Sequence, residues 1–208
     1  MYLIQEGVNT VDTAYTEPFL NLSPISTQSL SGTYNNLAAW TGISLADTPC
    51  QKTGDANPRF PIYLKQYNPA AQAQVYELFK QATTNASTPF SDALFMFEGY
   101  SQQGVKAIPD DATAFAYRAD NLLVAPLLTY AHDGPALDAV ALNLGNQIRQ
   151  ILYEGSGETS LNTYVNYAYG DETPAAWYGS ATWRQERLHT LKEDFDPQSK
   201  FSFYAPIA

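Results

Sequence analysis

Apolar residues recur at helical spacing in two long stretches of the chain. One helix is predicted to begin after Asp133-Gly134-Pro135 and to end at Gly155-Ser156-Gly157, because glycine commonly terminates helices. A second is predicted from Asn68-Pro69, an N-cap residue followed by proline at the first helical position, to about Thr83. Each pattern places one apolar stripe on the helix. The stripe of the first helix consists of Leu137, Val140, Ala141, Leu144, Ile148, Ile151 and Leu152.

Shorter helices are predicted at both ends of the chain. Residues from Asp12 to Leu22 and from Ser31 to Thr41 carry two short helical patterns. Near the carboxyl end, Thr173-Pro174 and then Ser180 precede a helical pattern that runs to about Asp194. Asp196-Pro197 then ends it, because the residue before a proline disfavours helical backbone.

Four further stretches predict extended structure. Tyr2 to Val8 alternates between two faces, as a strand does. Leu94 to Tyr100 is apolar on both faces, which predicts a central strand. Ala114 to Ala131 is extended but interrupted by Asn121 and Pro126, and a proline is expected at an edge, bulge or break. The stretch from Tyr164 to Tyr169 is predicted to be a strand too.

The strands and helices alternate without glycine-rich turns, which predicts an α+β fold: an antiparallel sheet with helices packed mainly on one face. A chain of 208 residues is long enough for a sizeable core, and we expect one domain over residues 1–208. The strands predicted here leave an apolar edge or face that needs a cover. We therefore expect a second copy of the chain on it, as a homodimer.

Charge limits the partners. Acidic residues outnumber basic ones 21 to 11, for a net charge of −10, and no Lys/Arg cluster is present to neutralise phosphates. Nucleic acid and anionic membranes are therefore not expected as partners. The sequence shows no signal peptide and no apolar run long enough to span a membrane, which predicts a soluble protein and leaves its localisation open.

Several kinds of catalytic centre lack their sequence signature. His132 and His189 have no second ligand at the spacing of a zinc motif, so no metal is expected. Cys50 has no adjacent histidine or basic residue that would lower its thiol pKa. A Gly-x-Ser-x-Gly motif does not occur, which argues against a common class of hydrolase.

The remaining candidates are phenols and one carboxyl group. Tyr164, Tyr167 and Tyr169 would share a face in a strand, where they form either core or the wall of a pocket. Glu98 lies on the same predicted face as Leu94 and Met96, within an apolar run. A carboxyl group in such a place is paired, has a raised pKa or faces a cleft. Glu98 is therefore a candidate site residue.

An ordered set of motifs carries a family resemblance over the last half of the chain, roughly from Ala93. Tyr-x-Asn-Tyr at residues 164–167 is followed by an acidic turn, by Ala176-Trp177-Tyr178-Gly179 and by Asp196-Pro197. Upstream, Asp111-Ala112-Thr113-Ala114-Phe115 and Arg118 match a further motif. Together they resemble the carboxyl end of the berberine-bridge-like flavin oxidoreductases. The resemblance implies a substrate domain made of an antiparallel sheet backed by helices.

The resemblance also implies roles for individual residues. It makes Tyr167 the base that takes a proton from a substrate hydroxyl, which requires a neighbour that stabilises the phenolate or holds the proton. Tyr167 and Glu98 are thus the catalytic candidates. Arg118 either contacts substrate or forms a structural ion pair with Asp111 or Asp120. The residues expected to bind an apolar small molecule are Tyr164, Asn166, Tyr169, Met96 and Arg118.

Members of the resembled family carry a flavin-binding domain ahead of these motifs. This sequence contains no Gly-rich phosphate loop, so no cofactor is expected in this chain alone, and FAD only if a separate flavin-binding domain is supplied. Three functions stay open. The first, favoured by the start at Met1, is a flavin-independent cyclase or isomerase of secondary metabolism. The second is the substrate half of an FAD-dependent oxidoreductase with Tyr167 as base, and the third is a non-catalytic small-molecule binder.

Overall fold

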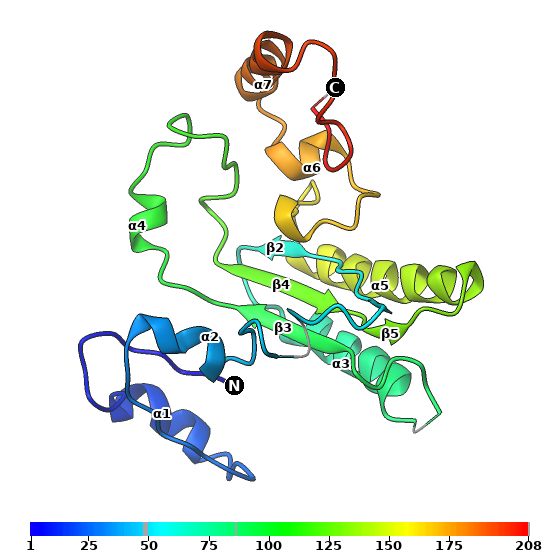
Figure 1. Ribbon diagram of the computed structural model, residues 1–208. Helices are drawn as coiled ribbons and strands as arrows, with labels where there is room; N and C mark the ends of the chain where they lie inside the picture. Colours follow the sequence, from blue (N-terminus) through cyan, green and yellow to red (C-terminus); the bar gives the residue numbers. More distant parts are fainter. Residues whose placement is uncertain (48–49, 86, 208) are drawn as a thin grey trace. The chain divides into compact units, whose positions relative to one another are not determined.

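The computed structural model describes residues 1–47, 50–85 and 87–207 (Figure 1). The chain forms two compact units, Met1–Thr53 and Gly54–Ala208. Each unit is described by itself below, and the expectation of one domain over residues 1–208 stays a prediction. Both buried apolar clusters consist of residues of the second unit.

The first unit contains the two short helices predicted for it. They are α1 (Thr13–Leu20) and, after the 3-10 turn η1 (Tyr34–Asn36), α2 (Leu37–Trp40). The predicted strand from Tyr2 to Val8 is wrong, because these residues pair with no strand among the described residues. An unpaired strand is unstable in water. Here the Gln5 side-chain amide instead donates to the Asp12 carboxylate and accepts the Asp12 backbone N–H.

The second unit is built on a three-stranded antiparallel sheet. Its order is β2 (Ile62–Leu64), β4 (Leu122–Leu127) and β3 (Leu94–Glu98). A separate two-stranded ribbon joins β1 (Asp55–Ala56) to β5 (Tyr130–Ala131). The central strand is therefore β4, whose last five residues are buried, and the prediction of a central β3 is wrong. Pro126 lies inside this central strand, one residue from its end, and its carbonyl accepts the Phe60 N–H at 3.1 Å.

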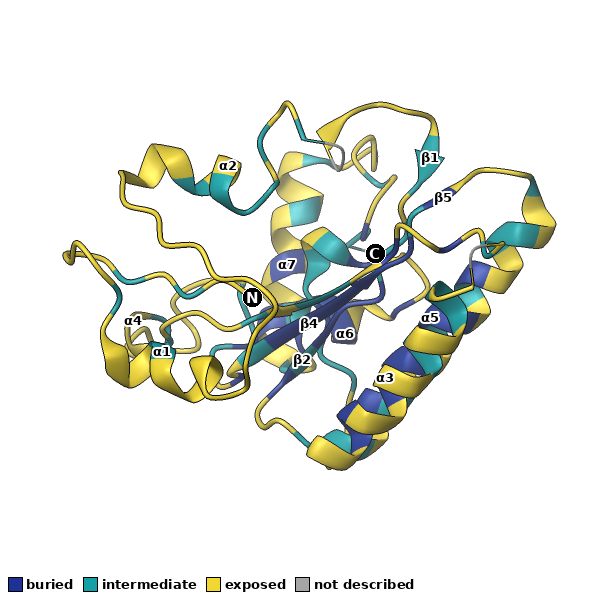
Figure 2. Cartoon of the chain, turned by 90° about the horizontal axis from the view of Figure 1, so that it is seen from below, coloured by how far each residue is buried: buried dark blue, intermediate teal, exposed yellow. Residues whose placement is uncertain are grey.

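Two long helices cover one face of this sheet (Figure 2). As predicted, α3 (Pro69–Thr83) is capped by the Asn68 side chain, and α5 (Pro135–Ser156) ends at Gly157, which has a left-handed backbone. Gly145 brings α5 close to the sheet, since a Cβ atom there would stand 2.1 Å from the Phe60 ring. The helix stripes and the strands form one core. It includes Ile62, Leu64, Val75, Val124, Leu144, Ile148 and Leu152.

The carboxyl-terminal part is helical. After the short α4 (Gln103–Lys106) of the β3–β4 connection, three elements follow α5: η3 (Val165–Tyr167), α6 (Pro174–Tyr178) and α7 (Thr182–Phe195). The strand predicted from Tyr164 to Tyr169 is wrong, because this segment turns as a 3-10 helix. With antiparallel strands and helices mainly on one face, the chain has the predicted α+β fold.

Candidate functional site

The sheet face opposite the helices carries a row of functional side chains. Strand register places Tyr63, Leu123 and Glu98 directly side by side across the three strands. Because side chains alternate along a strand, Met96 shares this face with Glu98, whereas Ile62 and Val124 point to the helices. One acidic group and one phenol thus lie among apolar residues on the open face.

The segment before η3 is attached to the edge of this face. The Tyr63 N–H donates to the Asn162 carbonyl at 2.8 Å, which fixes the chain beside β2. The Tyr164 ring then packs on the Tyr63 ring, with 6.0 Å between centres. In the 3-10 turn, residues three apart lie on one side, and the rings of Tyr164 and Tyr167 are 5.0 Å apart. The turn therefore gathers two phenols over the sheet. The expectation that a strand would place Tyr164 and Tyr167 on one face is wrong, because residues three apart in a strand point to opposite faces.

Tyr167 lies near Glu98, close enough for the charge of the carboxylate to act on its phenol. Tyr100 donates to the same carboxylate, with 2.9 Å between its hydroxyl and Oε2. Burial raises the pKa of Tyr167, and the negative charge of Glu98 raises it further. Burial and the same carboxylate raise the pKa of Tyr100 to about 12. Both phenols are therefore protonated near neutral pH, and Tyr100 donates to Glu98.

A cation lies on the other side of Tyr167. The guanidinium carbon of Arg59 is 4.4 Å from the centre of the Tyr167 ring, the geometry of a cation–π contact. Its positive charge lowers the pKa of Tyr167, against the larger effect of burial. Arg59 precedes β2 and pairs with Leu127, whose side chain shares the open face.

The predicted substrate-binding residues fall into two groups. Met96 and Tyr164 share the open face, and Asn166 donates to the Tyr164 hydroxyl at 2.8 Å. Tyr169 does not join them, because its ring stacks on Phe60, a residue of the helix-side core, with 5.0 Å between centres. The expectation of three tyrosines on one face is therefore wrong for Tyr169.

Arg118 serves a neighbouring loop. Its guanidinium donates to the carbonyl of Val105 at 3.3 Å and to the Thr113 hydroxyl at 2.5 Å. The ion pair expected with Asp111 or Asp120 does not form among the described residues. These contacts give Arg118 a structural role in the connection between β3 and β4. A contact of Arg118 with substrate stays a prediction.

Comparison with known proteins finds close relatives. The chain is 57% identical over 206 residues to the FAD-linked oxidoreductase chyH of Penicillium rubens, a match that covers 99% of this chain and 41% of the relative. It is 52% identical to the FAD-linked oxidoreductase chry5 of Gibberella zeae, over 99% of this chain and 40% of that protein. The chain thus spans about two fifths of the length of these relatives. No protein-family model matches it.

Solved structures show the same fold. The berberine bridge enzyme from Eschscholzia californica superposes with a TM-score of 0.71, over 97% of this chain and 44% of the enzyme, at 16% identity. The chain is related to the carboxyl-terminal part of the berberine-bridge-like FAD-linked oxidoreductases. A carbohydrate oxidase from Microdochium nivale shares the fold of this berberine-bridge-like part with a TM-score of 0.59, at 16% identity and over 94% of the chain.

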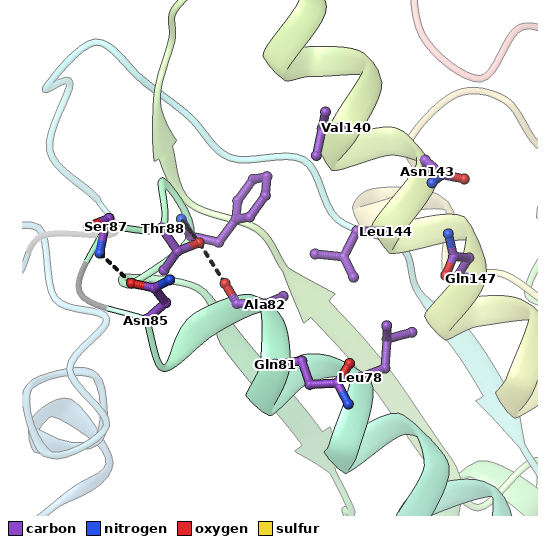
Figure 3. A pocket seen from close by; sticks show the side chains of 11 residues that line it. Leu78, Gln81, Ala82, Asn85, Ser87, Thr88, Val140, Asn143, Leu144 and Gln147 are labelled. Carbon is purple, nitrogen blue, oxygen red and sulfur yellow. Dashed lines mark hydrogen bonds between the residues drawn. The ribbon is translucent and has the colours of Figure 1, made fainter.

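Two hollows of the berberine-bridge-like part lie away from Tyr167 and Glu98. One, of about 450 Å³, opens between α3 and α5 and is lined by Leu78, Val140 and Leu144 with several amides (Figure 3). The other, of about 510 Å³, is lined by charged side chains, including Asp120 and Arg184. Neither of these two hollows is lined by Tyr167 or Glu98. The phenols and Glu98 instead make an open, aromatic surface on the sheet.

Sequence reasoning missed Arg59, Tyr63 and Tyr204 in this site. Tyr63 lies in the three-residue strand β2, and Arg59 precedes that strand. A strand of three residues is too short to produce a clear alternating pattern. Tyr204 is remote in sequence, yet its hydroxyl binds two carbonyls of the η3 segment. Only the fold relates these positions to Tyr167.

Other kinds of site find no support in the described part of the chain. No group of three or more His, Cys, Asp or Glu side chains there is arranged to hold a metal ion. Within the same residues, no helix combines the length and apolar character needed to cross a bilayer.

Proposed function

We propose that this chain provides the substrate-facing surface of an FAD-linked oxidoreductase that oxidises a hydroxyl group of an apolar small molecule. The observation that carries the proposal is the cluster of phenols around Glu98 on the open face: the rings of Tyr164 and Tyr167 are 5.0 Å apart, and the carboxylate accepts the Tyr100 hydroxyl at 2.9 Å and raises the pKa of Tyr167. A phenol beside a carboxylate offers a path for a proton. The relationship to FAD-linked oxidoreductases supplies the reaction class.

In the proposed reaction, Tyr167 works as a relay. A phenol whose pKa is raised keeps its proton near neutral pH and cannot act as a base by itself. The substrate hydroxyl transfers its proton to the Tyr167 oxygen while Tyr167 passes its own proton to the Glu98 carboxylate. The substrate is left as an alkoxide on its way to a carbonyl, and the proton rests on Glu98.

The surroundings suit an apolar, flat substrate. Tyr63 contacts three aromatic rings: Phe115 at 6.1 Å, Tyr117 at 5.5 Å and Tyr164 at 6.0 Å between ring centres. Aromatic walls of this kind bind through area and ring contacts, and few polar groups then set the orientation. Asn166 holds the Tyr164 hydroxyl in place and leaves that oxygen beside the relay.

The residues fit the ring side of a flavin. Tyr63, Tyr164 and Tyr167 form a half-buried aromatic surface suited to a planar ring, whereas the sequence contains no Gly-rich loop for the phosphates. When bound, the flavin supplies the oxidant that takes the hydrogen and two electrons of the substrate C–H bond. This chain's own residues orient the substrate and remove its hydroxyl proton.

A chimera tests the proposal. In the chimera, this chain replaces the matching 206 residues of the Penicillium rubens relative chyH. The substrate of chyH is added in the absence of oxygen, and bleaching of the flavin is followed. Unaltered chyH is the positive control. Tyr167→Phe keeps the ring and is expected to slow bleaching by about a hundredfold or more. Bleaching at the unaltered rate in the Tyr167→Phe chimera would overturn the proposal.

A flavin-independent cyclisation or isomerisation is the second candidate. The protonated phenol of Tyr167, next to a carboxylate, is equipped to donate a proton to a substrate and to recover it from Glu98. Under this alternative, the chain alone converts the same substrate without added flavin, and Tyr167→Phe abolishes the conversion. If the chain binds substrate without converting it under either condition, non-catalytic binding is the remaining function.

A further inference from the structure

The charged hollow of about 510 Å³ lies wholly within the second unit. Its volume falls in the range of about 300–1,000 Å³ that is typical of small-molecule sites. Most of the charges that line it are paired with one another. Lys65 binds Glu158 at 2.9 Å, and Arg149 binds Asp171 at 2.9 Å as well as Glu172. Two further charged groups of the wall have no such partner inside the hollow.

Asp120 is the carboxylate without a paired cation. It is buried, and of its two side-chain oxygens only Oδ2 accepts a hydrogen bond among the described residues, from the Asn162 amide at 3.0 Å. No side-chain cation of these residues lies within 4.0 Å of it, so the charge of Lys65 acts on it from a greater distance. Asp120 therefore offers a free acceptor and a negative charge to a cationic group in the hollow.

Arg184 is the cation with unfilled donors. It is 3% exposed, and its guanidinium donates from Nη2 alone, to the carbonyl of Asp110 at 3.2 Å and to the carboxylate of Asp110 at 2.8 Å. In the described part of the chain, neither Nε nor Nη1 has an acceptor. The Asp110 side chain is 62% exposed and does not line the hollow, so water screens its charge. A buried guanidinium in this state favours a carboxylate as ligand.

Tyr117 lies between the two groups. Burial raises the pKa of its phenol to about 12, the negative charge of Asp120 raises it as well, and the positive charge of Arg184 lowers it. Both charges therefore act within one hollow. Alanines add small apolar surface to the wall and leave room for the short carbon chain of a ligand with a polar group at each end. They are Ala116, Ala119, Ala175, Ala176 and Ala181.

We propose that this hollow is a second ligand site, which binds a small zwitterion of the amino acid class with its carboxylate on Arg184 and its ammonium on Asp120. Such a ligand supplies the donor that Asp120 lacks and the acceptor that Arg184 lacks. A simple anion would leave Asp120 without a cation, and a simple amine would leave the Arg184 donors unfilled. The lining contains neither Tyr167 nor Glu98, and the assignment does not depend on the function proposed above.

Burial gives the ammonium its value at this site. Burial raises the pKa of Asp120, because a charge away from water is penalised, and the hydrogen bond from Asn162 offsets only part of that penalty. An ammonium group beside the carboxylate would offset more of it. On the other side, the ring of Trp183 lies 4.5 Å from the guanidinium carbon of Arg184, and this contact and Asp110 hold the cation in place. The site is thus arranged before a ligand arrives.

The test is an NMR titration of the ¹⁵N-labelled chain, without a substrate or a flavin. Glycine, β-alanine and 4-aminobutyrate serve as probes, since they carry the same two charges at increasing separation. Saturable shifts are expected for the backbone amides of the lining, those of Asp120, Asn162 and Arg184 among them. Methylammonium and acetate, which carry one charge each, are expected to bind about tenfold more weakly than the best zwitterion, or worse. The absence of saturable shifts with all three zwitterions overturns the assignment, and so does equal affinity for acetate or methylammonium.

Two variants locate the binding. Asp120→Asn removes the negative charge, keeps an acceptor for Asn162 and is expected to weaken the best zwitterion by about tenfold or more. Ala119→Leu narrows the hollow from an exposed position without changing a charge, and is expected to weaken binding too. The matched control is Ala136→Leu, because Ala136 is exposed on α5 outside the lining.

Unchanged affinity in a folded Asp120→Asn or Ala119→Leu variant overturns the assignment, and so does an equal loss in Ala136→Leu. Because Ala119→Leu leaves every charge in place, it decides the question if Asp120→Asn does not fold. None of these outcomes bears on the chimera assay, in which failure of Tyr167→Phe to slow bleaching overturns the proposed function.

Discussion

The hydroxyl of Tyr204 donates to the carbonyl of Val165, with 2.6 Å between the two oxygens, and lies 2.9 Å from the carbonyl of Ala168. These carbonyls flank Tyr167 in the chain. A residue from the last few positions therefore fastens the 3-10 turn that presents the phenol to Glu98. The hydrogen bond is a link between the end of the chain and the site.

Tyr204→Phe is predicted to impair the site more than the fold. The loss of one partly exposed hydrogen bond costs about 1 kcal/mol of unfolding free energy, whereas a small displacement of a reacting group costs about a hundredfold in rate. Urea unfolding and flavin bleaching in the chimera measure the two effects. Tyr178→Phe is the control, because its hydroxyl binds the Ala205 carbonyl at 2.7 Å and lies outside η3. Equal loss of rate in both variants would contradict this view.

Glu98→Gln is predicted to stop the relay while it preserves its geometry. The amide oxygen still accepts the Tyr100 hydroxyl, but it does not take up a proton near neutral pH. Bleaching in the chimera is expected to fall by about a hundredfold or more.

The same Glu98→Gln substitution removes a negative charge beside Tyr167, so the pKa of the Tyr167 phenol is expected to fall. Asp138→Asn is the control, since Asp138 also accepts a tyrosine hydroxyl, that of Tyr130, at 2.8 Å. A Glu98→Gln chimera with normal turnover would remove the carboxylate from the reaction.

Gly145→Ala is predicted to destabilise the second unit. Alanine normally favours a helix over glycine by about 1 kcal/mol, but here the added Cβ atom would stand 2.1 Å from the ring of Phe60. Overpacking of this kind costs about 1–3 kcal/mol, which outweighs the gain in helix propensity. Urea unfolding measures the loss. Gly104→Ala, at a position with no neighbouring atom within 4 Å, is expected to be neutral or stabilising. A Gly145→Ala protein as stable as the parent would show that Phe60 moves without cost.

The sequence predicts the elements whose signal is long and local. The α3 and α5 helices carry apolar stripes over 15 and 22 residues, with the cap at Asn68 and the stop at Gly157. The strands are short and depend on partners that are remote in sequence. Thus β2, with three residues, has no readable alternation. The apolar β3 is an edge strand because, among the residues that the structure describes, it pairs with β4 alone.

The candidate site was predictable in part. Glu98 stands out as a carboxyl group in an apolar run, and the motif at residues 164–167 draws attention to Tyr167. Their contact depends on a 3-10 turn rather than the strand that alternating tyrosines suggest, and a hydrogen bond between the Tyr63 N–H and the Asn162 carbonyl positions that turn. The position of Arg59 over the Tyr167 ring depends on pairing with the end of β4, which no local pattern encodes.

Asp120 gives a prediction about pH. Its side chain is 4% exposed and accepts a hydrogen bond from the Asn162 amide at 3.0 Å, and Asn162 in turn binds β2 at Tyr63. Burial raises the pKa of Asp120, and the hydrogen bond from Asn162 offsets only part of that rise. The folded state therefore binds the Asp120 proton more tightly than the unfolded state does. It follows that stability is lost as the pH rises from the unfolded pKa, about 3.9, through the higher folded value.

Asp120→Asn removes this loss, because an amide is neutral at every pH and still accepts the hydrogen bond from Asn162. The variant and the parent are expected to have similar unfolding free energies at about pH 3, and the variant is expected to become the more stable one as the pH approaches about 7. Urea unfolding across this range measures the difference. Asp133→Asn, at an exposed position before α5, provides the baseline for removing one carboxyl group. A stability advantage of Asp120→Asn that is the same at both ends of the range, or reversed at neutral pH, would contradict this prediction. It would mean that the surroundings of the buried carboxylate, Lys65 among them, stabilise its charge more than burial destabilises it.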